Sequence, residues 1–248
     1  MLINTKLYDI FLDKAAGSKI RNVTLGLGYT AVQTEDGGLG LSYTYFKNKQ
    51  ACTAFKEYAD FEAVPADQLL AKIKSGNPLE RSIALALINA LNYQSAELLP
   101  EDRTNLKLLE RLQIKKGTRA AMVGHIKPLE QKLLQKNARV EVIDQFNKTG
   151  SEDSFFRYLQ SEADVLLLTS TTLLNNSTEM IFSRAGRNIE TAVLGPGTPM
   201  VPEAFDHLPV VMLCGTVPED KENVLKTVRH GFGTKYIHKF SRKVFMNC

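Results

Sequence analysis

The chain has 248 residues, of which 44% are hydrophobic and 23% charged, the composition of a globular protein with a sizeable core. The formal net charge of +4 comes from interleaved acidic and basic residues, and the sequence has no long basic block of the kind that binds nucleic acid. No apolar run approaches the ~20 residues of a membrane helix, and the N-terminus lacks the apolar segment of a signal peptide, so we expect a cytoplasmic protein.

The first 100 residues predict a small α+β domain. Apolar residues at helical spacing predict a helix over 6–15, and Asp-Gly and Gly-Gly steps at 36–38 indicate a hairpin between two β-rich runs. The runs span residues 22–33 and 39–47, and a further short strand is expected at 59–63. Pro65 and Asp67 indicate the start of another helix.

A helix with a clear start signal follows. Asn77 fits the N-cap and Pro78 the first helical position, while Glu80 at the third position can reach back to the Asn77 N–H group. The apolar stripe that follows predicts a helix buried on most sides.

Residues 101–248 predict a second domain of alternating strands and helices. After a helix at 106–112, strands are expected at 119–123, 139–143, 163–169, 190–194 and 208–213, helices at 126–136, 154–161, 177–185 and 219–231, and antiparallel edge strands at 235–239 and 243–246. This alternation is typical of a doubly wound, mostly parallel α/β sheet.

Ligands of such sheets bind beyond the carboxyl ends of the strands. Four of the predicted strands end in Gly, Ser, Thr or Pro, which let a ligand approach the backbone or supply hydroxyl groups. Ordinary strand-to-helix turns use the same residues, but four such loops on one edge favour a ligand cleft. The candidate binding residues are Gly124, Ile126, Thr169, Thr171, Thr172, Asn175, Gly195, Pro196, Gly197 and Thr198. We expect backbone N–H groups of 124–126 and 195–198 to cradle the ligand.

Several established sites are excluded by spacing. GxGxxG is absent after Val123, so NAD is not the expected cofactor, and neither a P-loop nor a GxSxG serine elbow occurs. The three cysteines, Cys52, Cys214 and Cys248, form no CxxC pair, and no HxH or HExxH is present. A disulfide framework and a preformed cysteine or histidine metal site are therefore not predicted. Cys214 ends a buried strand, where free cysteine usually packs as a small hydrophobe, although a reactive thiol remains an alternative.

Two titratable residues are candidates for proton transfer. His125 follows the first strand of the second domain and is expected at the cleft, as a ligand contact, a general acid or base, or a metal ligand. The alternative is a helix-start residue packed by its neighbours. Glu80 is the second candidate, although the helix cap alone would explain it.

Four segments together resemble the family described as "putative heavy-metal chelation". They are NPLER at 77–81, VGHIKPL at 123–129, ADVLLLTSTTLLN at 163–175 and LGPGTPMVP at 194–202. The resemblance covers nearly the whole chain. It implies an enolase N-terminal-like α+β domain over residues 1–100 and a Rossmann-like domain over residues 101–248, with one cleft between them.

On that reading Glu80 and Asn77 face His125 and the loops at 171–172 and 195–198. The leading hypothesis is a protein that binds a small polar or anionic, metal-chelating metabolite, with a role in heavy-metal handling. A lyase or transferase that uses His125 or Glu80 is the alternative, and a metal-sequestering protein is a third. The resemblance allows a metal ion or a metal-chelating small molecule as cofactor. We expect neither nucleic acid nor membrane as partner, and homo-oligomer formation stays open.

Overall fold

The structure is a computed structural model that describes residues 2–46, 55 and 58–248. The end of the predicted run at Lys47, and Cys52, lie outside the described residues. No helix in the described part of the chain is long and apolar enough to cross a membrane.

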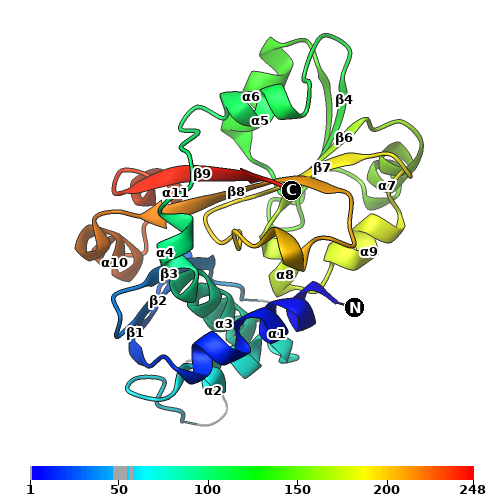
Figure 1. The fold of residues 1–248 in the computed structure, drawn as a ribbon. Helices are drawn as coiled ribbons and strands as arrows, with labels where there is room; N and C mark the ends of the chain where they lie inside the picture. The colour runs from blue at the N-terminus through cyan, green and yellow to red at the C-terminus, as the bar shows by residue number, and fades with distance from the viewer. Residues whose placement is uncertain (1, 47–54, 56–57) are drawn as a thin grey trace.

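The first part of the chain is a three-stranded antiparallel sheet, in the order β1-β2-β3, packed on helices (Figure 1). The bounds are α1 Ile3–Ala16, β1 Ile20–Leu25, β2 Tyr29–Thr34, β3 Leu39–Tyr43, α2 Ala66–Leu70, the 3-10 helix η1 Ala71–Lys74, α3 Pro78–Leu91 and α4 Tyr93–Ala96. The hairpin at 35–38 is confirmed, since β2 and β3 pair antiparallel across it.

Two predictions for this part are wrong. The run at 22–33 is two strands, because the chain turns at Gly26, whose added Cβ would lie 2.3 Å from the carbonyl oxygen of Val228. The expected strand at 59–63 is absent from the described residues. Residues 62–65 contact the start of the sheet through an isolated bridge between Lys19 and Pro65 and through hydrogen bonds of Glu62, Ala63 and Val64 to β1.

The second part is a six-stranded sheet in the order β5-β4-β6-β7-β8-β9. Its elements are α5 Leu106–Arg111, β4 Arg119–Val123, α6 Lys127–Gln135, β5 Arg139–Ile143, α7 Glu152–Ser161, β6 Val165–Thr169, α8 Thr171–Leu174, α9 Thr178–Ser183, β7 Glu190–Leu194, the 3-10 helix η2 Pro202–Ala204, β8 Val210–Pro218, α10 Lys221–Arg229, α11 Thr234–Ile237 and β9 Ser241–Asn247. All neighbours pair parallel except β8 and β9. The predicted α/β class with a mostly parallel sheet is confirmed.

The expected edge strand at 235–239 is wrong, because α11 occupies this segment. Helical spacing lets Ile237 enter the core beside Val224 and Val228 while Lys235 and Tyr236 stay exposed. The other edge strand is confirmed as β9.

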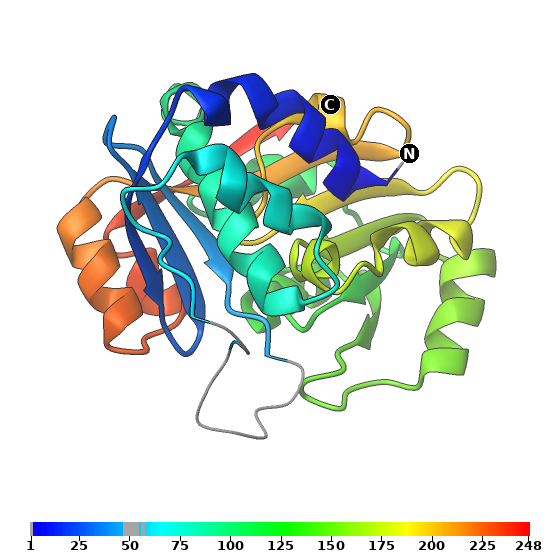
Figure 2. The same cartoon turned by 90° about the horizontal axis from the view of Figure 1, so that it is seen from below.

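Helices cover both faces of the six-stranded sheet. Leu108 of α5 and Leu133 of α6 pack on one face, and Phe155 of α7 packs on the other. The second face also receives α1 and α3, whose Leu7 and Leu87 belong to the same hydrophobic cluster (Figures 1 and 2). The two parts of the chain therefore share one core.

Strand order places a crevice between β4 and β6. From β4 the chain passes to β5 on one side and then crosses to β6 on the other. The loops after β4 and β6 therefore leave the sheet in opposite directions, and such a switch point is where open parallel sheets bind ligands.

Candidate functional site

Two adjacent cavities lie at the carboxyl ends of β4 and β6. The first, of about 380 Å³, is the aromatic cavity, which Tyr43 and Phe146 line. The second, of about 660 Å³, is the lysine cavity, which Lys127, Lys235 and Lys243 line. Both are lined by Tyr29, His125, Ile126 and Thr169. The two cavities are therefore adjacent, and together they are called the cleft.

The loop after β4 brings His125 to the centre of this cleft. Gly124 has φ +83°, and a Cβ there would lie 2.8 Å from Cγ2 of Thr169, so only glycine allows the loop to pass β6 this closely. The N–H of Gly124 donates to the carbonyl of Ile143, and the N–H of His125 donates to Oδ2 of Asp144, each over 2.8 Å. Two of the backbone donors expected to cradle a ligand are therefore already bound.

The His125 side chain has a carboxylate partner. Nε2 of His125 lies 2.7 Å from Oε2 of Glu130 on α6, and the imidazole is 15% exposed. A carboxylate that holds an imidazole fixes its orientation, as proton transfer requires. Sequence reasoning missed Glu130, although its spacing of five residues after His125 on the predicted helix was available.

Aromatic side chains from distant segments form one wall. Tyr29 of β2 and Tyr43 of β3 face each other in register with ring centroids 6.1 Å apart, and Phe146 from the β5–α7 loop lies 5.7 Å from Tyr43. Burial raises the pKa of Tyr29 to about 12 and, with the charge of Asp144, also raises the pKa of Tyr43. Both phenols are therefore protonated at neutral pH.

Asp144 gives this wall a fixed negative charge. Its carboxylate accepts the His125 N–H and both the N–H and the Nδ2 of Asn147. Burial raises the pKa of Asp144, but these hydrogen bonds outweigh burial and leave the pKa below its ordinary value. Sequence reasoning missed the aromatic wall and Asp144. The one local signal for the wall is a tyrosine at the end of each hairpin strand that lies away from the turn, Tyr29 in β2 and Tyr43 in β3.

The loop after β6 contributes hydroxyl and amide groups, most of them already bonded. The Thr172 hydroxyl donates to the Thr169 carbonyl and accepts from Thr178, both over 2.9 Å, and Thr172 is 2% exposed. The Asn175 side-chain oxygen accepts from the N–H and hydroxyl of Ser177. Thr169 and Thr171 are half-buried and line the aromatic cavity, so their side chains are the more accessible ones.

In the loop after β7, the first residues lie at the cleft and the next ones in the core. Gly195 and Pro196 line the lysine cavity. Gly197 and Thr198 are buried and line neither cavity; the Gly197 carbonyl accepts from Asn89 Nδ2 on α3 over 3.1 Å. The N–H groups of Gly195 and Thr198 donate to Cys214 and Gly195 carbonyls. This loop therefore joins the two parts of the chain more than it opens to a ligand.

Asn77 and Glu80 line neither cavity. Asn77 caps α3 as predicted, accepting the Leu79 N–H over 3.0 Å, but the Asn77 N–H donates to Ser75 Oγ rather than to Glu80. Glu80 pairs with Lys72 over 2.9 Å and with the Ser75 hydroxyl. Burial raises the pKa of Glu80, but these partners outweigh burial and lower it overall.

The side chains of the cleft do not fit a metal ion held by protein alone. Among residues 2–46, 55 and 58–248, no three His, Cys, Asp or Glu side chains are grouped as a metal site requires. Burial, and to a smaller degree Asp102, raises the pKa of Cys214 to about 12, so its thiol is protonated at neutral pH. A thiol in this state is a poor metal ligand.

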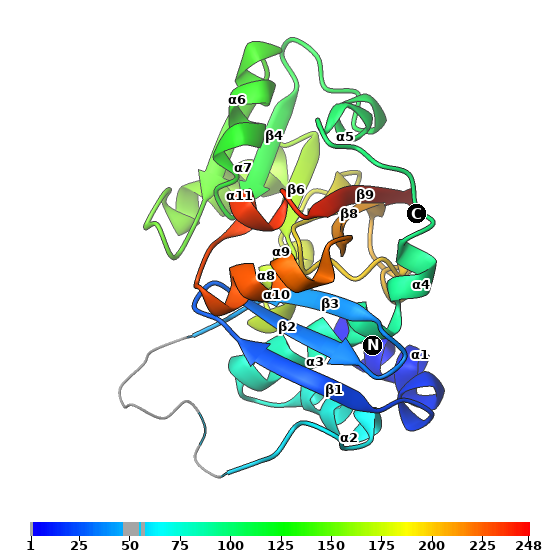
Figure 3. The same cartoon turned by 90° about the vertical axis from the view of Figure 1, so that its left-hand side faces the viewer.

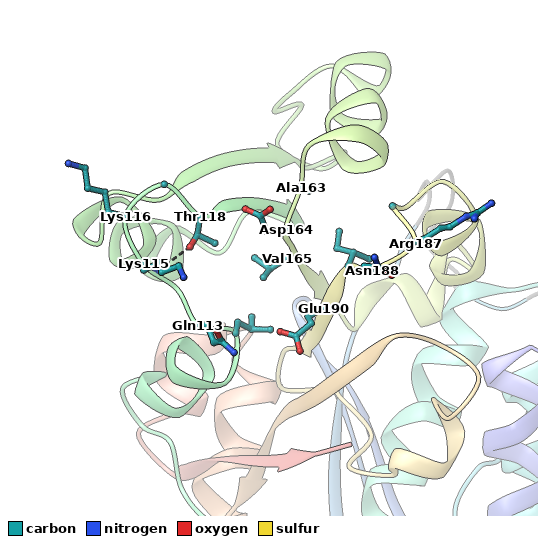
Figure 4. Close-up of a pocket in the computed structure, with 14 residues that line it drawn as sticks. Gln113, Lys115, Lys116, Thr118, Ala163, Asp164, Val165, Arg187, Asn188 and Glu190 are labelled. Carbon is teal, nitrogen blue, oxygen red and sulfur yellow. Dashed lines mark hydrogen bonds between the residues drawn. The ribbon is translucent and has the colours of Figure 1, made fainter.

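A third cavity, of about 720 Å³, lies at the opposite edge of the sheet, at the amino ends of β4, β6 and β7 (Figure 4). Its two carboxylates already have partners, since Asp164 pairs with Arg119 over 2.6 Å and Glu190 with Arg111 over 3.0 Å. Parallel sheets do not bind ligands at this edge by preference. The cleft at the carboxyl ends is therefore the candidate site.

Comparison with known proteins identifies the family. A family model described as "Putative heavy-metal chelation" matches residues 107–247, and a second model with the same description matches residues 8–92. The chain belongs to this chelation family. An uncharacterised protein of Methanocaldococcus jannaschii is 23% identical over 98% of this chain and 96% of its own length.

Two solved structures are similar to this chain over nearly its whole length. Both are proteins of unknown function from the DUF364 family, the family of the model that matches residues 107–247. The Pyrococcus horikoshii protein has a TM-score of 0.83 at 22% identity and covers all of both chains. The Desulfitobacterium hafniense protein has a TM-score of 0.76 at 20% identity and covers 98% of this chain and 100% of its own. At this identity the likeness shows the fold alone.

Proposed function

We propose that the protein binds a small polar or anionic organic metabolite, free or as a metal complex, in the cleft between its two parts. The observation that carries this proposal is the pair of adjacent cavities at the β4/β6 switch point, with aromatic rings from the first part and polar groups from the second. Tyr43 and Phe146 offer ring faces, while Thr169 and Thr171 offer hydroxyl groups.

The positions of the potential metal ligands in the protein favour a ligand that brings its own metal-binding groups. Histidine, cysteine and carboxylate side chains are too dispersed in the described residues to hold a metal. The family description names chelation, and an organic chelator would supply the missing ligands. In this proposal the protein contacts the organic rim of the complex and makes no direct metal bond.

Native mass spectrometry with elemental analysis of gently purified protein tests the proposal. We expect an organic mass that is retained by wild type, lost in Tyr43→Ala and retained in Tyr58→Ala, since Tyr58 is 93% exposed and lines neither cavity. Protein that purifies empty would be screened against metabolites by thermal shift with the same variants. Uptake of bare metal without an organic partner, or binding that is indifferent to Tyr43, would contradict it.

A second candidate function is proton transfer to or from the bound ligand by His125. The 2.7 Å contact between His125 and Glu130 at the junction of the two cavities favours it. If this is the function, His125→Gln should abolish turnover of an identified ligand while leaving its binding within a few fold. Equal turnover by the variant would leave binding as the function.

A further inference from the structure

Lys243 places a charged group inside the lysine cavity without a partner. It lies on β9 opposite Thr216 and is half-buried. In the described part of the chain its ammonium makes no hydrogen bond and no ion pair. Burial, followed by the charge of Lys132, lowers the pKa of Lys243, and the opposite effect of the Asp102 charge does not offset this. A half-buried charge without a partner is costly, and an anion in the cavity would remove this cost.

The other groups of the cavity leave its charge positive. Burial, and then the charge of Lys243, lowers the pKa of His238 to about 4, so this imidazole is neutral at pH 7. Lys127 and Lys235 are exposed at the same cavity. Three ammonium groups therefore face one carboxylate, that of Asp102, which is 8% exposed and accepts the N–H of Leu108 over 3.1 Å.

We propose that the lysine cavity binds an oxyanion group, a carboxylate or a phosphate, of a ligand whose organic part lies against Tyr43 and Phe146. The second half of this statement rests on the proposed function. The shared residues Tyr29, His125 and Thr169 make the two cavities adjacent, and in this proposal one molecule extends across both. Lys243 of β9 contacts the oxyanion inside the cavity. Lys235 lies on α11, the short helix that leads into β9 (Figure 3), and Lys127 begins α6; both line the same cavity.

Calorimetric titration at low salt tests the cavity with three probes: inorganic phosphate, benzoate and benzamide. Wild type should bind benzoate more tightly than its neutral analogue benzamide. Lys243→Met should weaken phosphate binding at least about tenfold, because a hydrogen bond to a charged group is worth that much or more. Lys239→Met is the matched control, because Lys239 is exposed and lines neither cavity, and it should bind as wild type does.

Two further variants keep the result clear. Lys235→Met changes an exposed residue, so it should fold normally and still weaken phosphate binding severalfold. Tyr43→Ala should leave phosphate binding unchanged while weakening benzoate, so loss of the organic contact and loss of the anion contact are measured separately. The preference between phosphate and benzoate tells which oxyanion the cavity takes. Equal binding of phosphate by wild type, Lys243→Met and Lys235→Met would overturn the inference, as would absence of any phosphate or benzoate binding.

Discussion

Thr172 lies at the candidate site yet uses its hydroxyl group inside the fold. The hydroxyl donates to the Thr169 carbonyl and accepts from Thr178, which ties α8 to the end of β6 and to α9. We expect Thr172→Val to lower the free energy of unfolding by about 1–3 kcal/mol, because two buried polar groups lose their partner. Urea denaturation followed by circular dichroism measures the change.

Thr171→Val is the control for that measurement. Thr171 is half-buried and its hydroxyl makes a longer contact, 3.2 Å, to Thr169 Oγ1. Its replacement should cost about 0.5 kcal/mol or less. Equal losses in the two variants would show that the hydrogen bonds of Thr172 are not what stabilises α8.

His238 makes stability depend on pH. Burial holds its pKa near 4 in the folded protein, against 6.5 for an ordinary histidine, so protonation favours the unfolded chain. The free energy of unfolding is not reduced by His238 above pH 6.5. It decreases as the pH falls towards 4 and does not decrease further below that pH. At a pH of about 4.5, wild type should have lost about 2 kcal/mol relative to its value at neutral pH through this group.

His238→Gln removes the titration and should flatten this part of the stability profile. Urea unfolding of both proteins between pH 4 and pH 7 gives the comparison. A constant difference between the two proteins over the whole range would mean that His238 does not titrate as its burial implies.

Local signals in the sequence located some residues of the site but not their partners. His125 and Thr169 could be placed at the cleft because each ends a predicted parallel strand. Tyr43 and Phe146 are about 100 positions apart, and no local pattern tells that they meet. Glu80 shows the reverse case, a candidate that lies away from the site. It was a candidate for the cleft because it is acidic and lies at a helix start, but it pairs with Lys72 and Ser75 and lines neither cavity.

Among the elements, α3 and β3 approach unusually closely. A Cβ added at Gly40 would lie 2.1 Å from the Ala86 carbonyl oxygen in the backbone of α3. Gly40→Ala must therefore push the helix from the sheet, and we expect a loss of about 3 kcal/mol or more. Thermal denaturation measures it, with Gly28→Ala as control because nothing lies within 4 Å of the added Cβ there. Similar melting of the two variants would contradict the close packing.

Strands that alternate with helices in the second part were predictable, and elements shaped by tertiary contact were not. The predicted strands at 119–123, 139–143 and 190–194 match β4, β5 and β7. The run at 22–33 looked continuous because Gly26 and Gly28 gave no sign of the nearby α10 backbone. The segment of α11 looked like a strand because four residues are too few to show helical periodicity.

Across the whole molecule, one core joins the parts that the sequence divided at residue 100. Leu87 of α3, Leu168 of β6 and Val193 of β7 belong to one buried cluster. We expect a single unfolding transition in urea, with coincident curves from circular dichroism and tyrosine fluorescence. A fragment of residues 101–248 alone should fail to fold cooperatively, since it would expose that face of the sheet. Two separate transitions of the full chain would contradict a shared core.

The aromatic wall also gives the protein an optical property. The chain has eight tyrosines and no tryptophan, so tyrosine dominates its ultraviolet fluorescence. Tyr29 and Tyr43 line the cleft, and the ring of Tyr45 lies next to that of Tyr43. A bound chromophore or metal complex that absorbs tyrosine emission would therefore quench a sizeable share of the signal, and occupancy can be followed in the unlabelled native chain.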